Sequence, residues 1–456
     1  MAFGGYPGIK MLDFLLIFVF CVLGVLLGVV TGLLPGLHVN NVALIMLSAS
    51  STIVAFCQPL FSYGITEYFI LILIAGFMIS VSISHSFHDT IPSTFIGAPE
   101  EETALSVLPA HTLLLKGEGY KAVSLAVMGS YGAILVCMAA LYPVRFIIGP
   151  PLSLYTVLRE ILVWILLAIV ILMITTEKTR VIDFGDAGKI PSILGMLFAA
   201  FVFVLSGIFG LIVFEIHLQS PLGLPAPVLF PALAGLFGIP TLLTSLFTKP
   251  VIPEQKIEPL SLNRIEKQSS GVSIFTGSLT GLFVSIIPGL TTATGTVLAM
   301  TIRQKSSQEQ TLVTLSSVNT AATFSVTVML FIIMRARSGV TIAISELMPL
   351  EPWKSLAMPA VLIYLLMFLI LSGTLSYFLT LWLGRLFARK FHVVPYQTLV
   401  VITLVFVVVL VVLFTGILGL IVLFVATSIG LLPVCWGVRR SHCMGILLLP
   451  IILYFL

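Results

Sequence analysis

Long apolar runs, each close to the length of a membrane span, follow one another along almost the whole chain. A transmembrane helix needs about 20 predominantly apolar residues. The runs near this length are residues 13–34, 67–87, 121–148, 158–176, 190–217, 224–247, 271–287, 311–334, 355–387, 396–415, 417–436 and 441–456. The short alternating strands typical of membrane barrels do not occur. The pattern therefore predicts an all-α polytopic membrane protein of roughly 10–12 transmembrane segments.

The composition agrees with this fold class and indicates where the protein is located and which partners are expected. Hydrophobic residues make up 59% of the 456 residues and charged residues only 9%, whereas soluble proteins carry about 25% charged residues. The net charge of +4 is spread over the loops, so no nucleic-acid partner is expected. The N-terminal apolar run lacks a small-residue cleavage site and reads as a retained first helix. We expect a multi-pass protein of the cell (cytoplasmic) membrane, surrounded by membrane lipids.

The chain repeats itself. Residues 24–37, "GVLLGVVTGLLPGL", and 277–290, "GSLTGLFVSIIPGL", share six identities at an offset of 253 residues. The segments "GIFGLIVF" from Gly207 and "GILGLIVL" from Gly416 share six of eight residues at an offset of 209. We predict a transmembrane repeat at 11–248, a polar linker at 249–270 and a second repeat at 271–456, with the extra chain of the first half in the polar stretch 84–120. An odd number of spans in each half would make the repeats inverted, as in many secondary transporters.

Each repeat contains a proline-glycine break inside its apolar run. Proline removes a backbone donor and glycine frees the backbone, so one helix ends and a new one begins. The free N–H groups of the new helix favour an anion, and hydrogen-bonding side chains follow each break. With the breaks themselves, the candidate substrate-binding residues are Pro35, Gly36, His38, Asn40, Asn41, Pro288, Gly289, Thr291, Thr292 and Thr294. A kinked helix with polar capping residues is the alternative, and the duplication favours the binding site.

The polar stretch 84–120 holds ionisable residues directly after an apolar run. His85, His88 and Asp89 have the i, i+3, i+4 spacing of one helix face. They fit a proton or substrate contact, a metal site or plain polar packing, and without a third strong ligand nearby we expect no metal. The stretch is interpreted as a re-entrant hairpin with turns at Pro92 and Pro99. We group Ser93 with the histidines and Asp89 as coupling or gating candidates.

The second half offers three further candidates. Asn319 lies in the apolar run 311–334 and either binds substrate or joins helices through its amide. Arg335 and Arg337 follow the end of that run. Guanidinium groups match carboxylate and phosphate geometry, so these arginines are either an anion clamp or a solvated pair near lipid head groups. They complete the coupling or gating set.

Four motifs together resemble one known family. They are "GVVTGLLPGL", "IPSTFIGAPEEETALSVLPAHTLLLKGEGYKAVSLAVMGS", "SIIPGLTTATGTVLAM" and "SSVNTAATFSVTVML". In this order they resemble the TctA-like large permease family of the tripartite tricarboxylate transporters, in its divergent archaeal-type branch. The resemblance implies cation-coupled uptake of organic anions. It also implies a small membrane subunit and an extracytoplasmic binding protein as partners.

The leading hypothesis is a secondary active transporter of a carboxylate-type organic anion that works by alternating access and is coupled to H⁺ or Na⁺. It predicts no catalytic residue and no cofactor beyond the coupling ion. An alternative is a translocase of an anionic lipid carrier such as polyprenyl phosphate. A third hypothesis is an intramembrane metal-dependent hydrolase that uses the two histidines, Asp89 and Glu100 to Glu102. A homo-oligomer is compatible with all three hypotheses.

Overall fold

The computed structural model describes residues 11–34, 39–97, 105, 107–177, 190–216, 218, 220–221, 228–248, 253–286, 292–303, 307–391 and 396–456. No strand occurs among these residues. Eight helices are long and apolar enough to cross a membrane. They are α1 (Met11–Leu33), α3 (Glu67–His88) with its continuation α4 (Thr90–Phe95), α6 (Gly119–Ile148), α8 (Ile190–Glu215), α11 (Arg264–Ile286), α13 (Gln308–Ile332), α15 (Ala360–Phe391) and α16 (Tyr396–Trp436). The predicted all-α polytopic membrane protein is confirmed.

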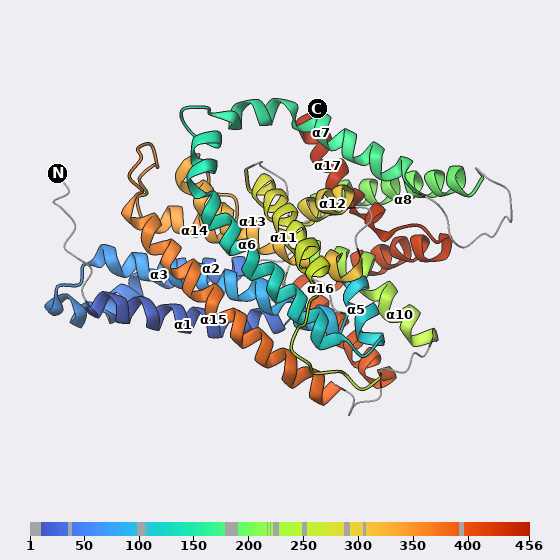
Figure 1. The fold of residues 1–456 in the computed structure, drawn as a ribbon, viewed down its shortest axis with the longest axis horizontal. Coiled ribbons are helices and arrows are strands. Elements are labelled where there is room, and N and C mark those ends of the chain that lie inside the picture. Colours follow the sequence, from blue (N-terminus) through green and yellow to red (C-terminus); the bar gives the residue numbers. More distant parts are fainter. Residues whose placement is uncertain are drawn as a thin grey trace.

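Shorter helices complete the bundle (Figure 1). They are α2 (Val39–Phe56), η1 (Gln58–Tyr63), α5 (Val107–Leu115), α7 (Leu154–Thr175), α9 (Leu229–Leu233), η2 (Ala234–Gly238), α10 (Ile239–Thr248), α12 (Thr292–Ile302), α14 (Gly339–Leu347), η3 (Arg440–Met444) and α17 (Gly445–Phe455). Helix α16 contains Gly416 at φ +67°. That left-handed residue interrupts the helix where the sequence predicts two separate spans, 396–415 and 417–436.

Close helix pairs organise each half of the chain around small residues. On α1, Gly24, Gly28 and Gly32 contact α3, and a Cβ atom built on Gly28 would lie 2.4 Å from the Cβ of Ser84. On α11, Gly277 and Gly281 contact α13 in the same way. Residues without side chains let helix backbones approach closely, which is how helices associate in lipid. The repeated glycine motif is therefore a packing surface in both halves.

These contacts also locate extra chain in the first half. Gly24 contacts Ser80 and Gly277 contacts Ser317, so the partners are 56 residues apart in the first half and 40 in the second. Part of the extra length therefore lies before α3, in the segment that contains α2 and η1. The sequence prediction places all of the extra chain within residues 84–120, and it is wrong for the part that lies before α3.

The long helices of the two halves also cross over each other. Figure 1 shows α15 beside α3, and α6 beside α13 and α11. Phe69 meets Tyr364 and Phe95 meets Phe387, so α3 and α15 are parallel. Ser86 faces Thr320, whereas the earlier residue Ser82 shares a cavity with the later residue Thr327, so α3 and α13 are antiparallel. The two halves are thus interleaved, and the inverted relation between them stays a prediction.

The polar stretch after α3 is more helical than predicted. Only Asp89 separates α3 from α4, and Pro92 lies in the first turn of α4, where its missing N–H costs little. Pro92 therefore sets no turn, and that part of the predicted hairpin is wrong. The described helix ends before Gly97, which has φ +73°. Pro99 and Glu100 to Glu102 lie outside the described residues.

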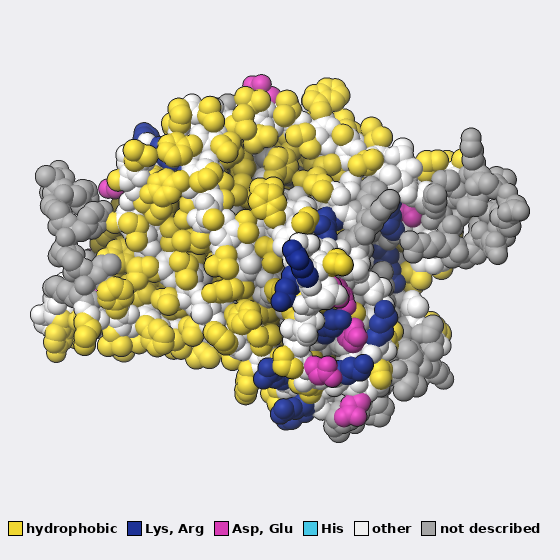
Figure 2. All heavy atoms as spheres, viewed as in Figure 1, with side chains coloured by type: hydrophobic (Ala, Val, Ile, Leu, Met, Phe, Trp, Pro, Cys, Tyr) yellow, Lys and Arg dark blue, Asp and Glu magenta, His cyan; other side chains and the backbone are white. Residues whose placement is uncertain are grey.

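Charged groups gather at one end of the bundle, which we call the linker end: linker residues 253–263, the start of α6, the start of α13 and the end of α15. Lys256 N donates to Gly117 O over 2.8 Å, Lys121 pairs with Glu309, and Arg385 Nε donates to the Tyr120 hydroxyl over 2.7 Å. Figure 2 shows Lys, Arg, Asp and Glu concentrated over part of one face, with hydrophobic side chains over most of the remainder. This apolar covering suits a lipid surface.

Candidate functional site

A group of buried polar side chains lies where α3 crosses α1 and α13. We call it the crossing cluster: Thr31, His85, His88, Asp89 and Asn319. Asn319 Nδ2 donates to Asp89 Oδ2 over 2.9 Å, and the two residues are 4% and 2% exposed. The bond joins residues 230 positions apart in the sequence. One half of the chain therefore supplies the carboxylate and the other half its amide donor.

The two histidines of the crossing cluster face α1. His85 Nδ1 lies 3.1 Å from Thr31 Oγ1, and Thr31 Oγ1 also donates to Gly28 O over 3.1 Å. His88 Nδ1 donates to Ser84 O over 2.7 Å, so in the neutral ring Nε2 is the acceptor nitrogen. His88 Nε2 is buried and has no hydrogen-bond partner among the described residues. These contacts place both histidines against α1, whereas Asp89 is bonded to α13.

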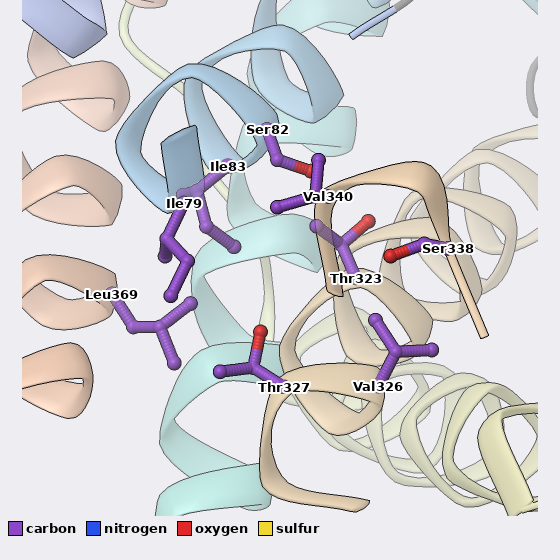
Figure 3. Close-up of a pocket in the computed structure, with 9 residues that line it drawn as sticks. All are labelled: Ile79, Ser82, Ile83, Thr323, Val326, Thr327, Ser338, Val340 and Leu369. Carbon is purple, nitrogen blue, oxygen red and sulfur yellow. The ribbon is translucent and has the colours of Figure 1, made fainter. Parts of the chain in front are cut away.

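Beside the crossing cluster, a small cavity separates α3 from α13 (Figure 3). Ser82 of α3, Thr323 and Thr327 of α13 and Ser338 before α14 contribute hydroxyl groups, and Leu369 of α15 lies on the opposite wall. The space is about 10 Å³, enough for one water molecule. A carboxylate substrate does not fit in a space of this size.

The residues of the two breaks are only partly described. Pro35, Gly36, His38, Pro288, Gly289 and Thr291 lie outside the described residues, and the side chains of Asn41 and Thr294 are likewise not described. Asn40 lies in the first turn of α2 against Gly339 of α14, whose Cβ would be 2.7 Å from it. Thr292 is the first residue of α12. The substrate site between the breaks stays a prediction.

The remaining candidates lie apart from the histidines. Ser93 Oγ donates to the backbone oxygens of Asp89 and Thr90, each over 3.0 Å, and so stabilises α4. Arg335 and Arg337 both lie over the ring of Tyr155, at 5.9 and 5.7 Å from its centre. Cation–π contacts of this kind fix the arginines at the end of α13, beside the start of α7.

Glu177, Arg439 and His442 form a second ionic cluster, which was not predicted from the sequence. Glu177 Oε2 accepts from Arg439 Nε, and His442 Nε2 lies 2.8 Å from the same oxygen. Arg439 Nη2 also donates to Thr176 Oγ1 over 3.0 Å. The partners lie more than 260 residues apart in sequence. The signal that could have found them is the single histidine between "RRS" and a fully apolar C-terminal run.

Glu177 makes the stability of the fold depend on pH. Burial alone raises the pKa of its carboxyl, but hydrogen bonds from His442 and Arg439 outweigh it and lower the pKa below its usual value. A carboxyl with a lowered folded-state pKa stabilises the fold fully above its unfolded pKa, about 4.3, and this contribution is lost as pH falls through the folded value. We expect the melting temperature in detergent to decrease when the pH is lowered below about 4.

The Glu177→Gln variant tests this assignment. Because glutamine cannot titrate, we expect the variant to melt at a lower temperature than the native protein near pH 7 and to lose less on acidification. Thermal unfolding followed by tryptophan fluorescence from pH 3 to pH 8 gives both curves. Parallel curves for the two proteins would show that other groups carry the acid sensitivity.

Metal chemistry has little support in the described part of the chain. No group of three His, Cys, Asp or Glu side chains there could hold a metal ion. The hydrolase hypothesis joins His85, His88 and Asp89 to the glutamates 100–102, which lie outside the described residues. Of the first three, Asp89 is engaged with Asn319 and His88 with its own helix.

Comparison with known proteins identifies the family to which the chain belongs. The family model described as "Tripartite tricarboxylate transporter TctA family" matches residues 18–445. A protein of Methanocaldococcus jannaschii, described as uncharacterized, is 29% identical over 443 residues, which cover 96% of this chain and 98% of the relative. No solved structure matches. This multi-pass membrane protein therefore belongs to the TctA family of tripartite tricarboxylate transporters.

Proposed function

We propose that the chain is a secondary active transporter of a carboxylate-type organic anion, that it is driven by H⁺ or Na⁺, and that Asp89 is the coupling group. The observation that carries this is the hydrogen bond between Asp89 and Asn319 in the crossing cluster. An ionisable side chain at membrane depth is costly to keep, so such residues commonly mark ion and substrate pathways. The family is a transporter family, which fits a role in ion movement and not in catalysis.

The position of Asp89 suggests how an ion would act on the structure. Its carboxylate accepts from a helix of the other half, so protonation or Na⁺ binding changes the bond that joins α3 to α13. His85 and His88 lie on the same helix within one turn and supply ring nitrogens for proton movement. A change in ion occupancy therefore biases the contact between the two halves, as coupling requires.

The arrangement of the helices supports alternating access by two inverted repeats. Helices α3 and α13 are antiparallel at their crossing. In inverted-repeat transporters, broken helices with N-termini near the midplane bind the anionic group. The breaks after α1 and α11 are the proposed counterparts, with His38, Asn40 and Asn41 in one half and Thr291, Thr292 and Thr294 in the other as donors. A small membrane subunit and an extracytoplasmic binding protein are the proposed partners.

Reconstitution into liposomes tests the proposal. We expect radiolabelled citrate, or another member of a panel of di- and tricarboxylates, to accumulate when an inward gradient of H⁺ or Na⁺ is imposed. Collapse of the gradient with an ionophore should release the accumulated anion. Exchange of labelled for unlabelled anion, measured without any gradient, separates binding and movement from coupling. Neither accumulation nor exchange with any panel member, with the predicted partner subunits present or absent, would contradict the proposal.

A further inference from the structure

A cavity lined by both polar and apolar side chains lies away from the crossing cluster. It has a volume of about 270 Å³ between α5, the end of α7, α10, α12, the start of α13 and η3. Gln308, the first residue of α13, is exposed at its rim, beside Glu309 of the linker end. The cavity is therefore large enough for a small organic molecule and opens toward the charged end of the bundle.

Two arginines line this cavity, and they differ in their partners. Arg439 is neutralised by Glu177. Arg440 Nη1 donates to Phe237 O over 3.3 Å and to the Thr241 hydroxyl, and neither acceptor carries a charge. Within the described residues, Arg440 forms no salt bridge with a carboxylate. A half-buried guanidinium without a counter-ion creates a positive potential that attracts an anion.

The local fold explains why Arg440 reaches this position. Helix α9 passes into the π-helical turn η2, and Pro240 follows without an N–H to offer the preceding turn. The carbonyl of Phe237 accepts from both Thr241 Oγ1 and Arg440. π-turns occur frequently at functional sites because they redirect backbone groups. Here the turn holds the guanidinium at the cavity wall and leaves its other N–H groups for a ligand.

The rest of the lining matches a carboxylate with a short hydrocarbon body. Hydroxyl groups come from Thr301, Thr311 and Ser441, and apolar surface comes from Val297 and Met300 of α12. Guanidinium groups bind carboxylates through paired hydrogen bonds. The hydroxyls of Thr301 and Thr311 donate to the backbone oxygens of Val297 and Ser307, so they add polar surface to the lining and no free donor. An inorganic ion would leave the apolar wall uncovered. A small organic anion uses both parts of the lining.

We propose that this cavity is a binding site for a soluble organic anion, with one carboxylate on Arg440. Helix α12 follows the second break, so the site lies on the path between that break and the linker end. The choice of a carboxylate rests on the proposed transport function, whereas binding itself requires no transport. The shared chemistry would also suit an anionic lipid head group, and the rim at Gln308 among charged helix ends favours a solute from water.

The labelling rate of a cysteine introduced into the cavity tests anion binding directly. In a Cys435→Ser background, which removes the exposed native thiol, Ser441→Cys places a thiol in the cavity. Labelling rates are measured with an anionic and with a cationic methanethiosulfonate reagent. We expect citrate to slow both reactions and the anionic reagent to react faster than the cationic one. Arg440→Gln should abolish the charge preference and weaken citrate protection about ten- to hundredfold, the effect of losing a charged hydrogen bond.

A second pair of variants keeps Arg440 in place and covers the case in which Arg440→Gln fails to fold. Met300→Glu adds a carboxylate to the lining of the same cavity, where it should compete with the anion for Arg440 and abolish citrate protection. Met300→Gln has the same size without the charge and should retain protection. Citrate protection that is absent from the reporter protein, or equal in Met300→Glu and Met300→Gln, would overturn the proposal.

Two further outcomes separate the possible ligands and functions. Protection by phosphatidylglycerol in nanodiscs without protection by citrate would assign the cavity to a lipid head group and overturn the soluble-anion site. Citrate protection that depends on Arg440 in a protein without gradient-driven uptake would support the site while the transport proposal fails. Loss of citrate protection in Arg440→Gln, with gradient-driven uptake intact in the same variant, would show that the transported anion does not bind at Arg440.

Discussion

Gradient-driven accumulation of the transported anion should be lost in the Asp89→Asn variant. Asparagine has the size of aspartate and can still accept a hydrogen bond from Asn319 Nδ2, so the crossing of α3 and α13 keeps its packing. It cannot take up a proton and carries no charge for Na⁺. We expect accumulation in liposomes to fall at least about a hundredfold, because a coupling group that cannot change its charge no longer links ion and substrate. Exchange without a gradient should persist.

Two controls separate coupling from packing. Ser93→Ala removes a buried hydroxyl one turn after Asp89 that bonds only to backbone oxygens in the interactions described, and it should leave accumulation near the native level. The exchanged pair Asp89→Asn with Asn319→Asp keeps one carboxylate and one amide at the crossing but moves the charge to α13. Native accumulation by Asp89→Asn alone would place the coupling ion elsewhere.

The spans were the most predictable part of the fold, because lipid imposes a length and an apolar composition on each of them. The predicted boundary between 396–415 and 417–436 coincides with Gly416, where the chain adopts a left-handed conformation. The prediction failed at Pro92, which was expected to set a turn. A proline ends a helix from its interior but is tolerated in the first turn, and the start of α4 at Thr90 is not evident from sequence.

The crossing cluster was partly predictable, because ionisable residues stand out in an apolar run. His85, His88, Asp89 and Asn319 were all candidates, but only the structure pairs Asp89 with Asn319. Thr31 was missed because a threonine in a helix commonly bonds to its own backbone, as Thr31 also does with Gly28.

The cavity at Arg440 and the Glu177 cluster were beyond the reach of sequence reasoning. Their arginines belong to a short charged segment, "RRS", that reads as an ordinary loop. Whether an arginine is solvated or faces a cavity depends on chain more than 190 residues away, at Phe237 and Thr241. Local pattern carries no information about such contacts.

Replacement of Gly281 by valine should destabilise the protein strongly, whereas the same change at Gly271 should not. Both residues belong to α11. A Cβ at Gly281 would lie 2.5 Å from Val318 O and 2.8 Å from the Cβ of Ala321, while a Cβ at Gly271 meets nothing within 4 Å. Overpacking typically costs about 1–3 kcal/mol, and a backbone oxygen cannot move aside as a flexible side chain can. Thermal unfolding in detergent, followed by size-exclusion chromatography, measures the difference.

The comparison also tests whether the glycine motif serves the same purpose in both halves. Gly28 on α1 corresponds to Gly281 in the repeat, and its Cβ would lie 2.7 Å from Val81 O. If these glycines are packing surfaces, Gly28→Val and Gly281→Val should each lower the melting temperature, and their effects should add, because the two contacts share no residue. Equal stability of the Gly281→Val and Gly271→Val proteins would instead mean that α11 and α13 can separate at little cost. The motif would then be retained for movement between helices and not for their tight association.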